Sequence, residues 1–500
     1  MRYLLGLDNG GTSSKAVLFD QGGRAVASAS RMTPMETPKV GYTERDMELL
    51  WRANCEVIRE TIAASGVDAG DIAGVSFSGH GKGLYLWGAD EKPAYPGIVS
   101  TDSRAYQIVA DWYRDGTAEK AFPLTCQSVL ASQPVALLKW FQQNRPEVLA
   151  KTKWIFGVKD YVRYRMTGEA YAEITDISGS SLVNLSTAAF DDEILALFGL
   201  EEIRDKLPPT VYSSQFCGKV TKACAAATGL AEGTPVAAGL FDIDACAIGM
   251  NVVDDTYLAV IAGTWSINEY ASRKPVTDGS VKMNSLYCLP DMYLVEECSP
   301  TSASNQEWFV KSFLKEAAGD RKLYHVADEM VESVGADETN ILFLPYLYGG
   351  SDDPRAGAAF VNVSAAHTRS HMLRAVYEGI VFGHRLHIER LLKSRDRAPK
   401  GIRLAGGVTN APMWVQMFAD ILGMDVETIE VKELGALGAA MTAAVAAGLY
   451  PDLAAAAGAM VKVSRTYHPN PALKEIYDRK YRGFAAVVDA LAPVWAKLER

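Results

Sequence analysis

Aspartates that directly follow apolar segments are the residues of this 500-residue chain best placed for chemistry. Asp242 ends the stretch 233–242, where a carboxylate can orient an acceptor hydroxyl and take its proton. Asp244 is a rival for that role, because the segment is expected to turn into a helix there. Asp8 ends the first apolar segment, and a strand-end aspartate can hold Mg²⁺ through water. An aspartate beside glycine is often only a turn or cap residue, so neighbouring motifs must support these roles.

Two glycine-containing turns are suited to holding phosphate. One lies in Asp8-Asn-Gly-Gly-Thr12 and the other in Ala262-Gly-Thr264, at matching places in the two halves of the chain. Glycines let backbone N–H groups approach a phosphate closely, and threonine adds a hydroxyl donor. A single Gly-Gly turn is better explained as an ordinary hairpin, but one turn in each half suits a triphosphate held by two domains. The predicted phosphate contacts are Gly10, Gly11, Thr12, Ser13, Gly263 and Thr264.

A third glycine pair, in Leu404-Ala-Gly-Gly-Val-Thr-Asn410, ends a predicted strand and precedes a helix. Gly406 and Gly407 would let an adenosine lie against the backbone, with Asn410 as a polar contact. The small residues of 433–440 form its predicted partner helix, although close helix packing explains that segment equally well.

Candidate contacts to the molecule that carries the acceptor hydroxyl lie in two further segments. His80, Gly81 and Lys82 come after one of them, and Lys82 can donate to a carbonyl or hydroxyl or pair with a carboxylate. An exposed, solvated lysine is the alternative. Asp102, close to Arg104, is a candidate ligand for hydroxyl groups, with a buried ion pair or a helix N-cap as an equally good explanation.

Short strands followed by longer helices must position these residues. The pattern predicts strands at Tyr3–Asp8, Ser14–Asp20, Arg24–Ser30 and Ile72–Ser78, and a helix from Met47 that stops at Gly66. Strands at 258–261 and 266–272 repeat the first pattern, which indicates an internal duplication. We therefore expect an α/β fold with mixed sheets covered on both faces and two domains, residues 1–250 and 251–500.

The composition excludes several classes of protein. A hydrophobic share of 48% supports two cores, and the net charge of −10 argues against nucleic acid or an anionic membrane as the partner. Residues 434–449 are apolar but short and rich in Gly and Ala, which predicts a buried helix rather than a membrane span. Seven scattered cysteines without a Cys-x-x-Cys pair, and the absence of a signal-peptide pattern, favour a reducing, cytoplasmic location.

Over essentially its full length the chain resembles the FGGY carbohydrate kinases. Their C-terminal signature is matched by 358–363 and 371–378, with Asn362 in place of the usual glycine. Their N-terminal signature is echoed by 132–140, where Leu137 replaces the customary lysine.

The resemblance implies actin-like (ribonuclease-H-like) ATPase domains, with ATP and Mg²⁺ bound in a cleft between a sugar-binding N-terminal domain and a nucleotide-binding C-terminal domain. Asp8 would organise the metal, Asp242 matches the catalytic base, and the glycine turns would meet the nucleotide. Family members are often dimers, so a homodimer is expected.

Within the family, the residues are most similar to the bacterial L-xylulose kinase branch. Gly81 and Lys82 stand where D-xylulose kinases usually carry Met-His and glycerol kinases Arg-Glu, while His80 replaces a more usual glutamine. The expected acceptor is a ketopentose, L-xylulose first, phosphorylated at a terminal hydroxyl. D-xylulose, ribulose, glycerol and the keto-sugar acid 3-keto-L-gulonate remain alternatives, and Lys82 would suit the carboxylate of the last.

Other functional classes would require different sequence features. An actin- or chaperone-like switching ATPase would hydrolyse ATP without sugar and need a partner-binding domain, for which the two halves leave little room. A sugar sensor would have lost Asp8 or Asp242, and both are present. A nicotinamide dehydrogenase would carry Gly-x-Gly-x-x-Gly after its first strand, and this chain does not.

Overall fold

The computed structural model describes residues 2–319 and 321–498, with the side chains of 317 and 318 left out. The chain divides into two compact units. Unit 1 contains the residues up to Val253, Ala271–Val295 and Glu433–Val461. Unit 2 contains Asp254–Tyr270, Glu296–Lys432 and the residues from Lys462 onward. The predicted boundary near residue 250 lies at the first change of unit, and the two later segments return to unit 1.

The main sheet of unit 1 has the strand order β13-β14-β5-β1-β2-β3. Its strands are β1 (Tyr3–Asn9), β2 (Ser13–Asp20), β3 (Ala25–Met32), β5 (Ile72–Gly79), β13 (Phe216–Lys219) and β14 (Pro235–Ala237). β1 pairs antiparallel with β2 and parallel with β5. The short β15 (Leu240–Phe241) also pairs parallel with β5. The predicted N-terminal strands are confirmed to within two residues at each end.

Unit 2 repeats this topology. Its strands lie in the order β19-β17-β16-β22-β23-β24. They are β16 (Tyr257–Ala262), β17 (Ser266–Ser272), β19 (Tyr293–Ser299), β22 (Gly401–Ala405), β23 (Val426–Ile429) and β24 (Val463–Tyr467). β16 pairs antiparallel with β17 and parallel with β22, as β1 does with β2 and β5. β23 then runs parallel to β22, and β24 antiparallel to β23, as β14 and β13 do in unit 1. The predicted duplication is confirmed.

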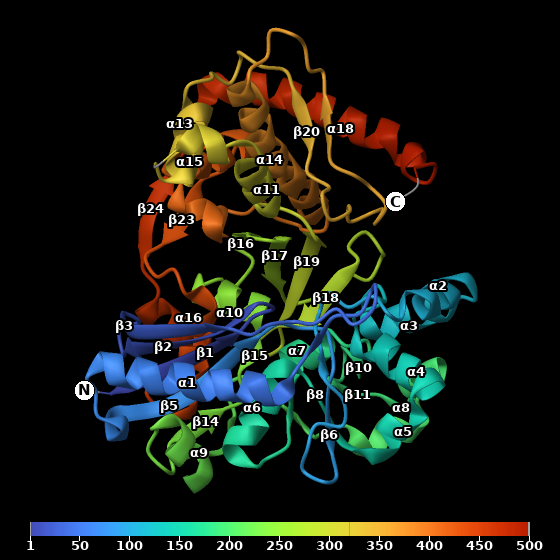
Figure 1. Cartoon of the computed structure of the whole chain (residues 1–500), viewed down its shortest axis with the longest axis vertical. Helices are drawn as coiled ribbons and strands as arrows, with labels where there is room; N and C mark the ends of the chain where they lie inside the picture. The colour runs from blue at the N-terminus through green and yellow to red at the C-terminus, as the bar shows by residue number, and fades with distance from the viewer. Residues whose placement is uncertain (1, 320, 499–500) are drawn as a thin grey trace. The chain divides into compact units, whose positions relative to one another are not determined.

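One face of the unit 1 sheet packs on α1 (Met47–Ser65), which runs along strands coloured blue in Figure 1. Alternate strand residues such as Leu5 and Phe77 enter a common core with Leu50 and Val57 of this helix. Asp46 caps the helix by accepting from two backbone N–H groups of the first turn. Gly66 ends the helix in the left-handed conformation, with φ 65°, as the sequence predicted.

The other face packs on α16 (Leu434–Ala446), the predicted small-residue helix. A Cβ added at Gly6 on β1 would overlap the carbonyl oxygen of Ala436, so the helix backbone lies directly on the strand. Farther along, the Ser76 and Thr442 hydroxyls are 2.6 Å apart. Close helix packing, one of the two explanations that the sequence left open for this segment, fits these contacts, and the predicted sheet with two covered faces is confirmed in unit 1.

Unit 1 contains further helices and short strands. The helices are α2 (Tyr106–Arg114), α3 (Thr117–Thr125), α4 (Pro134–Asn144), α5 (Pro146–Lys151), α6 (Val158–Thr167), α7 (Ile174–Ser178), α8 (Asp192–Phe198), α9 (Lys222–Thr228), α10 (Asp242–Gly249) and α17 (Leu453–Met460). The short strands are β4 (Glu44–Arg45), β6 (Tyr85–Gly88), β7 (Gly97–Ile98), β8 (Thr152–Phe156), β9 (Ala172–Glu173), β10 (Val183–Asn184), β11 (Ala189–Phe190), β12 (Thr210–Val211) and β18 (Met283–Leu286). Leu137, the departure from the N-terminal signature, lies fully buried in the core of α2–α5 and α8, which explains its apolar character.

The helices of unit 2 include α14 (Arg369–Lys393) and α18 (Lys474–Trp495), which are 25 and 22 residues long. Unit 2 also contains α11 (Ser304–Phe313), α12 (Lys315–Ala318), α13 (Leu323–Glu332) and α15 (Pro412–Leu422), and the short strands β20 (Leu342–Leu344) and β21 (Ala359–Val361) pair with each other. Asn362 adopts φ 66°, a conformation that asparagine tolerates better than most residues, so the turn survives the loss of the usual glycine. Across the described ranges, no helix combines the length and apolar character needed to cross a membrane.

Candidate active site

Unit 1 places Asp242 at the first residue of α10, directly after β15. Because β15 runs parallel to β5, with Phe241 opposite Gly79, Asp242 emerges beside the loop that begins at the end of β5. Asp8 is near the end of the adjacent strand β1, where the Ser78 hydroxyl donates to its carboxylate over 2.7 Å. The predicted base and the predicted metal ligand therefore lie at the ends of the two strands that flank β5.

The electrostatics of Asp242 are those of a proton acceptor. Burial raises its pKa well above the ordinary value, and the negative charges of Asp8 and Asp176 raise it further. Lys82 opposes this effect and lowers the pKa of Asp242, as does the backbone N–H of Ile243. Burial also raises the pKa of Asp8, against the hydrogen bond from Ser78 and the charge of Lys15. The site thus gathers carboxylates that would be stabilised by a bound cation.

The loop that carries Lys82 has little freedom. A Cβ at Gly81 would overlap the ring of Phe241, and one at Gly83 would overlap the carbonyl oxygen of Ile98. Lys82 itself adopts φ 60°, which costs a non-glycine residue roughly 1–2 kcal/mol. Strain of this kind persists where the surroundings determine the conformation, and it often marks a functional position.

His80 and Asp102 are held by other protein groups. The ring nitrogens of His80 lie 3.1 Å from the Tyr85 hydroxyl and 3.2 Å from the Gly81 carbonyl oxygen. Burial, with a smaller contribution from Arg45, lowers the pKa of His80 to about 3. Its role as a sugar ligand stays a prediction.

Asp102 accepts a bidentate pair of hydrogen bonds from the Arg104 guanidinium, which stacks on the rings of Tyr42 and Trp140. It also accepts from the backbone N–H of Thr43 over 2.7 Å. The geometry matches the buried ion pair that the sequence left open for Asp102, and contact with a sugar hydroxyl stays a prediction.

The first phosphate turn, Gly10–Ser13, joins β1 to β2. The buried guanidinium of Arg45 supports it by donating to the carbonyl oxygens of Gly10 and Gly11. Thr12 is exposed, and no described atom beyond its neighbours lies within 4 Å of a Cβ built at Gly11. The tip of the turn is open, as a phosphate-binding loop requires.

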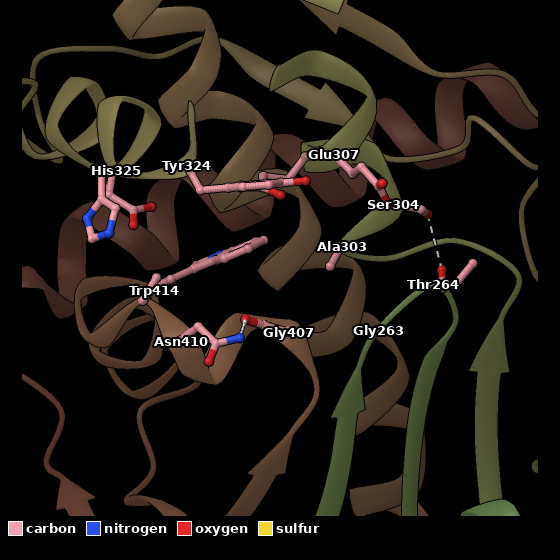
Figure 2. A pocket seen from close by; sticks show the side chains of 13 residues that line it. Gly263, Thr264, Ala303, Ser304, Glu307, Tyr324, His325, Gly407, Asn410 and Trp414 are labelled. Carbon is pink, nitrogen blue, oxygen red and sulfur yellow. Dashed lines mark hydrogen bonds between the residues drawn. The ribbon is translucent and has the colours of Figure 1, made fainter. Parts of the chain in front are cut away.

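Unit 2 contains a pocket of about 440 Å³, shown in Figure 2. Four predicted nucleotide contacts line it, namely Gly263, Thr264, Gly407 and Asn410. The other lining residues are Ala303, Ser304, Gln306, Glu307, Tyr324, His325, Asp328, Ala411 and Trp414. Gly406 precedes this wall at φ 99°, and a Cβ there would overlap the carbonyl oxygen of Ala262, so this glycine brings the loop against β16. The four lining residues come from the turn between β16 and β17 and from the segment after β22, and their contact with a nucleotide stays a prediction.

The aromatic part of the pocket was not predicted. Figure 2 shows the rings of Tyr324 and Trp414 nearly edge-on and facing each other across the pocket. The indole of Trp414 packs on Tyr377, with ring centroids 4.2 Å apart. The Tyr377 hydroxyl donates to Asp328 over 3.0 Å and accepts from Gln306 over 2.9 Å. Aromatic residues on separate helices give no motif, so only the fold brings them together.

The second phosphate turn is supported from behind by His384. The carbonyl oxygen of Thr264 accepts from the Ser302 N–H over 3.0 Å and from the Ser304 hydroxyl over 3.1 Å. His384 Nε2 lies 2.9 Å from the Ser302 hydroxyl, and its Nδ1 lies 2.7 Å from Asn268 Oδ1. Burial lowers the pKa of His384 to about 3, so the ring is neutral. These contacts give His384 a structural role, and the described residues contain no cluster of metal-ligating side chains.

Comparison with known proteins gives matches over the whole chain. Residues 3–249 match the N-terminal domain model of the FGGY family of carbohydrate kinases, and residues 258–447 match its C-terminal domain model. The L-xylulose/3-keto-L-gulonate kinase of Escherichia coli K12 is 35% identical over 500 residues, covering 100% of this chain and 99% of that protein. The probable L-xylulose kinase of Pasteurella multocida is 36% identical over 494 residues, with 98% and 99% covered. A ligand-bound xylulose kinase from Lactobacillus acidophilus superposes with a TM-score of 0.91 at 26% identity, covering 100% of both chains.

Proposed function

The chain belongs to the FGGY family of carbohydrate kinases, and we propose that it phosphorylates a terminal hydroxyl of a ketopentose, with L-xylulose as the preferred acceptor. Membership of this family makes the chain an ATP-dependent sugar kinase with the actin-like ATPase fold. The observation that supports the proposed site best is Asp242, which starts α10 beside Asp8 and Lys82 and has a raised pKa. Relatives named as L-xylulose kinases support the choice of acceptor.

In the proposed reaction, the Asp242 carboxylate accepts a hydrogen bond from the acceptor hydroxyl and takes its proton as the oxygen attacks the γ-phosphorus of ATP. The new O–P bond forms while the bond from the γ-phosphorus to the β–γ bridging oxygen breaks, and ADP leaves. A raised pKa makes Asp242 a better proton acceptor than an ordinary aspartate once it is ionised.

We place the metal at Asp8. The negative charges of Asp8 and Asp176 both raise the pKa of Asp242, so a bound Mg²⁺ would fit the negative charge that gathers there. Such an ion would keep several water ligands, because the described residues hold no group of three metal-ligating side chains. When bound, Mg²⁺ neutralises negative charge on the transferring phosphates.

ATP is assigned to the two phosphate turns and the pocket of unit 2. Gly263 and Thr264 would hold phosphate, while Gly407 and Asn410 would meet the adenosine. The Tyr324 and Trp414 rings offer a stacking surface for the base. Gly10–Ser13 form the corresponding phosphate turn of unit 1.

A keto-sugar acid is a second candidate acceptor. Lys82 brings a positive charge to the site, and the Escherichia coli relative carries 3-keto-L-gulonate in its name as well as L-xylulose. If Lys82 pairs with a substrate carboxylate, Lys82→Met should lower kcat/KM for the sugar acid far more than for L-xylulose. An unchanged ratio of the two kcat/KM values would remove this candidate.

A homodimer, which we infer from the family alone, is tested by light scattering on the purified protein.

The direct test is ADP release from Mg-ATP with a panel of acceptors, comparing wild type with Asp242→Asn. The panel contains L-xylulose, D-xylulose, L-ribulose, D-ribulose, glycerol and 3-keto-L-gulonate. We expect turnover that depends on the sugar and a fall in kcat of about 10²–10⁴-fold in the variant, the usual contribution of a general base. Hydrolysis that needs no acceptor would favour a switching ATPase, and full activity of the variant would remove Asp242 as the base.

A further inference from the structure

The short segment Ala238–Phe241 leads directly into Asp242 and is held from one side by α6 and α7. The Arg163 guanidinium on α6 donates to the carbonyl oxygen of Ala238 over 2.6 Å. The backbone N–H of Phe241 donates to the Thr175 hydroxyl on α7 over 2.9 Å. Both ends of the segment are therefore fixed by side chains that lie outside the proposed site.

Thr175 is itself held in one orientation. Its hydroxyl donates to Glu173 Oε2 over 2.8 Å, so the oxygen lone pairs are free to accept from Phe241. Glu173 Oε1 accepts from the Ser213 hydroxyl over 2.7 Å, and the Ser213 carbonyl oxygen accepts from the Gly239 N–H. A single buried carboxylate thus connects two hydrogen bonds to the segment before Asp242.

A cluster of buried charges fixes Glu173 in turn. Lys159 Nζ lies 3.3 Å from Glu173 Oε2, 3.1 Å from Asp160 and 3.4 Å from Asp176. The side chains of Lys159, Asp160 and Glu173 are fully buried. Buried ion pairs contribute little net stability because desolvation offsets their attraction, but they restrict the geometry strongly. The cluster is better explained as a device that fixes position than as a source of stability.

We propose that Thr175 is a positioning residue for the catalytic base, acting through its hydrogen bond to Phe241, the residue before Asp242. This inference rests on the proposed role of Asp242. Phe241 is the N-cap residue of α10, so its position sets where the first residue of the helix, Asp242, presents its carboxylate. Phosphoryl transfer depends mainly on positioning, and a misplacement of about 1 Å can cost roughly 10²-fold in rate.

Thr175→Val tests the proposal, because valine keeps the shape of threonine and removes the hydroxyl. We expect kcat with the best acceptor to fall at least tenfold, while KM for ATP stays within twofold of wild type. Thr61→Val is the matched control. Thr61 is also fully buried in unit 1, and its hydroxyl donates to the Val57 carbonyl oxygen on α1, away from Asp242. Thr175→Ser, which restores the hydroxyl, should recover most of kcat.

Equal kcat in Thr175→Val and Thr61→Val would overturn the proposal, as would a loss that Thr175→Ser does not recover. If Thr175→Val does not fold, Ser213→Ala gives the readout, since it removes the hydrogen bond from the Ser213 hydroxyl to Glu173 and should lower kcat several-fold. An unchanged kcat there would also overturn the proposal. Asp242→Asn distinguishes a failure of the positioning role from a failure of the proposed base. An inactive Asp242→Asn beside a fully active Thr175→Val removes the positioning role alone, and an active Asp242→Asn removes the base as well.

Discussion

Gly438 on α16 lies so close to Ala245 on α10 that an added Cβ would overlap the Ala245 carbonyl oxygen. The contact is between two backbones, so no side-chain rotation could relieve it. It has a counterpart one turn earlier, where a Cβ at Gly435 would stand 3.2 Å from the carboxylate of Asp8. The small residues of α16 therefore let this helix approach both α10, which begins at Asp242, and the end of β1, which carries Asp8.

The first prediction concerns this contact. Gly438→Ala should destabilise the protein by about 1–3 kcal/mol, because the methyl group forces α16 away from α10. Gly458→Ala is the control, since Gly458 is an exposed residue inside α17 with no described atom beyond its neighbours near the added Cβ. Alanine should stabilise that helix by up to about 1 kcal/mol. Urea denaturation measures both, and equal midpoints would contradict the prediction.

The parts of the candidate site that could be predicted from the sequence are those where the backbone conformation requires a particular residue type. A Cβ at Gly81 would overlap a ring, and a Cβ at Gly406 would overlap a carbonyl oxygen. Glycine is therefore required at both positions, and the two motifs could be recognised from the sequence alone. The same logic located the strand ends that carry Asp8 and Asp242, because short apolar runs between turns are distinctive.

Other parts depend on contacts between distant segments and left no local signal. Thr175 and Phe241 are 66 residues apart, and their hydrogen bond exists only because α7 packs beside β15. Tyr324 and Trp414 come from two helices of unit 2 whose sequences read as ordinary amphipathic segments. The helix at 433–440 shows the converse case, since small residues predict close packing but not which partner is packed.

The second prediction tests the aromatic pocket. Tyr324→Ala should raise KM for ATP by about 3–10-fold with little change in kcat, because a stacking contact worth roughly 1 kcal/mol is lost. Tyr324 is already 44% exposed, so folding should be unaffected. Tyr348→Ala, at another exposed tyrosine of unit 2, is the control and should behave as wild type. Equal KM values for ATP in the two variants would show that the base does not stack on Tyr324.

The third prediction concerns stability in acid. The folded protein keeps His384 neutral with a pKa of about 3, whereas the unfolded chain binds a proton near pH 6.5. Between these values the unfolded state holds more protons, so the free energy of unfolding falls as pH decreases below 6.5. At pH 5 this histidine should account for a loss on the order of 1–2 kcal/mol. Denaturation at pH 7.5 and pH 5 should show a smaller loss for His384→Asn than for wild type, while replacement of the exposed His468 serves as control.

The last prediction uses two charged residues that shift the pKa of Asp242 in opposite directions. Asp242 must be ionised to accept a proton, so kcat should rise with pH through its raised pKa. Lys82 lowers that pKa, and Lys82→Met should therefore move the acid limb of the kcat profile to higher pH. Asp176 raises it, and Asp176→Asn should move the same limb to lower pH. Profiles of kcat at saturating L-xylulose and Mg-ATP measure both shifts, and Thr61→Val should leave the limb where wild type has it. Because loss of folding or of substrate affinity cannot shift one limb in both directions, opposite displacements would identify the titrating group as Asp242. Limbs that coincide with wild type in both variants would mean that another group controls the profile.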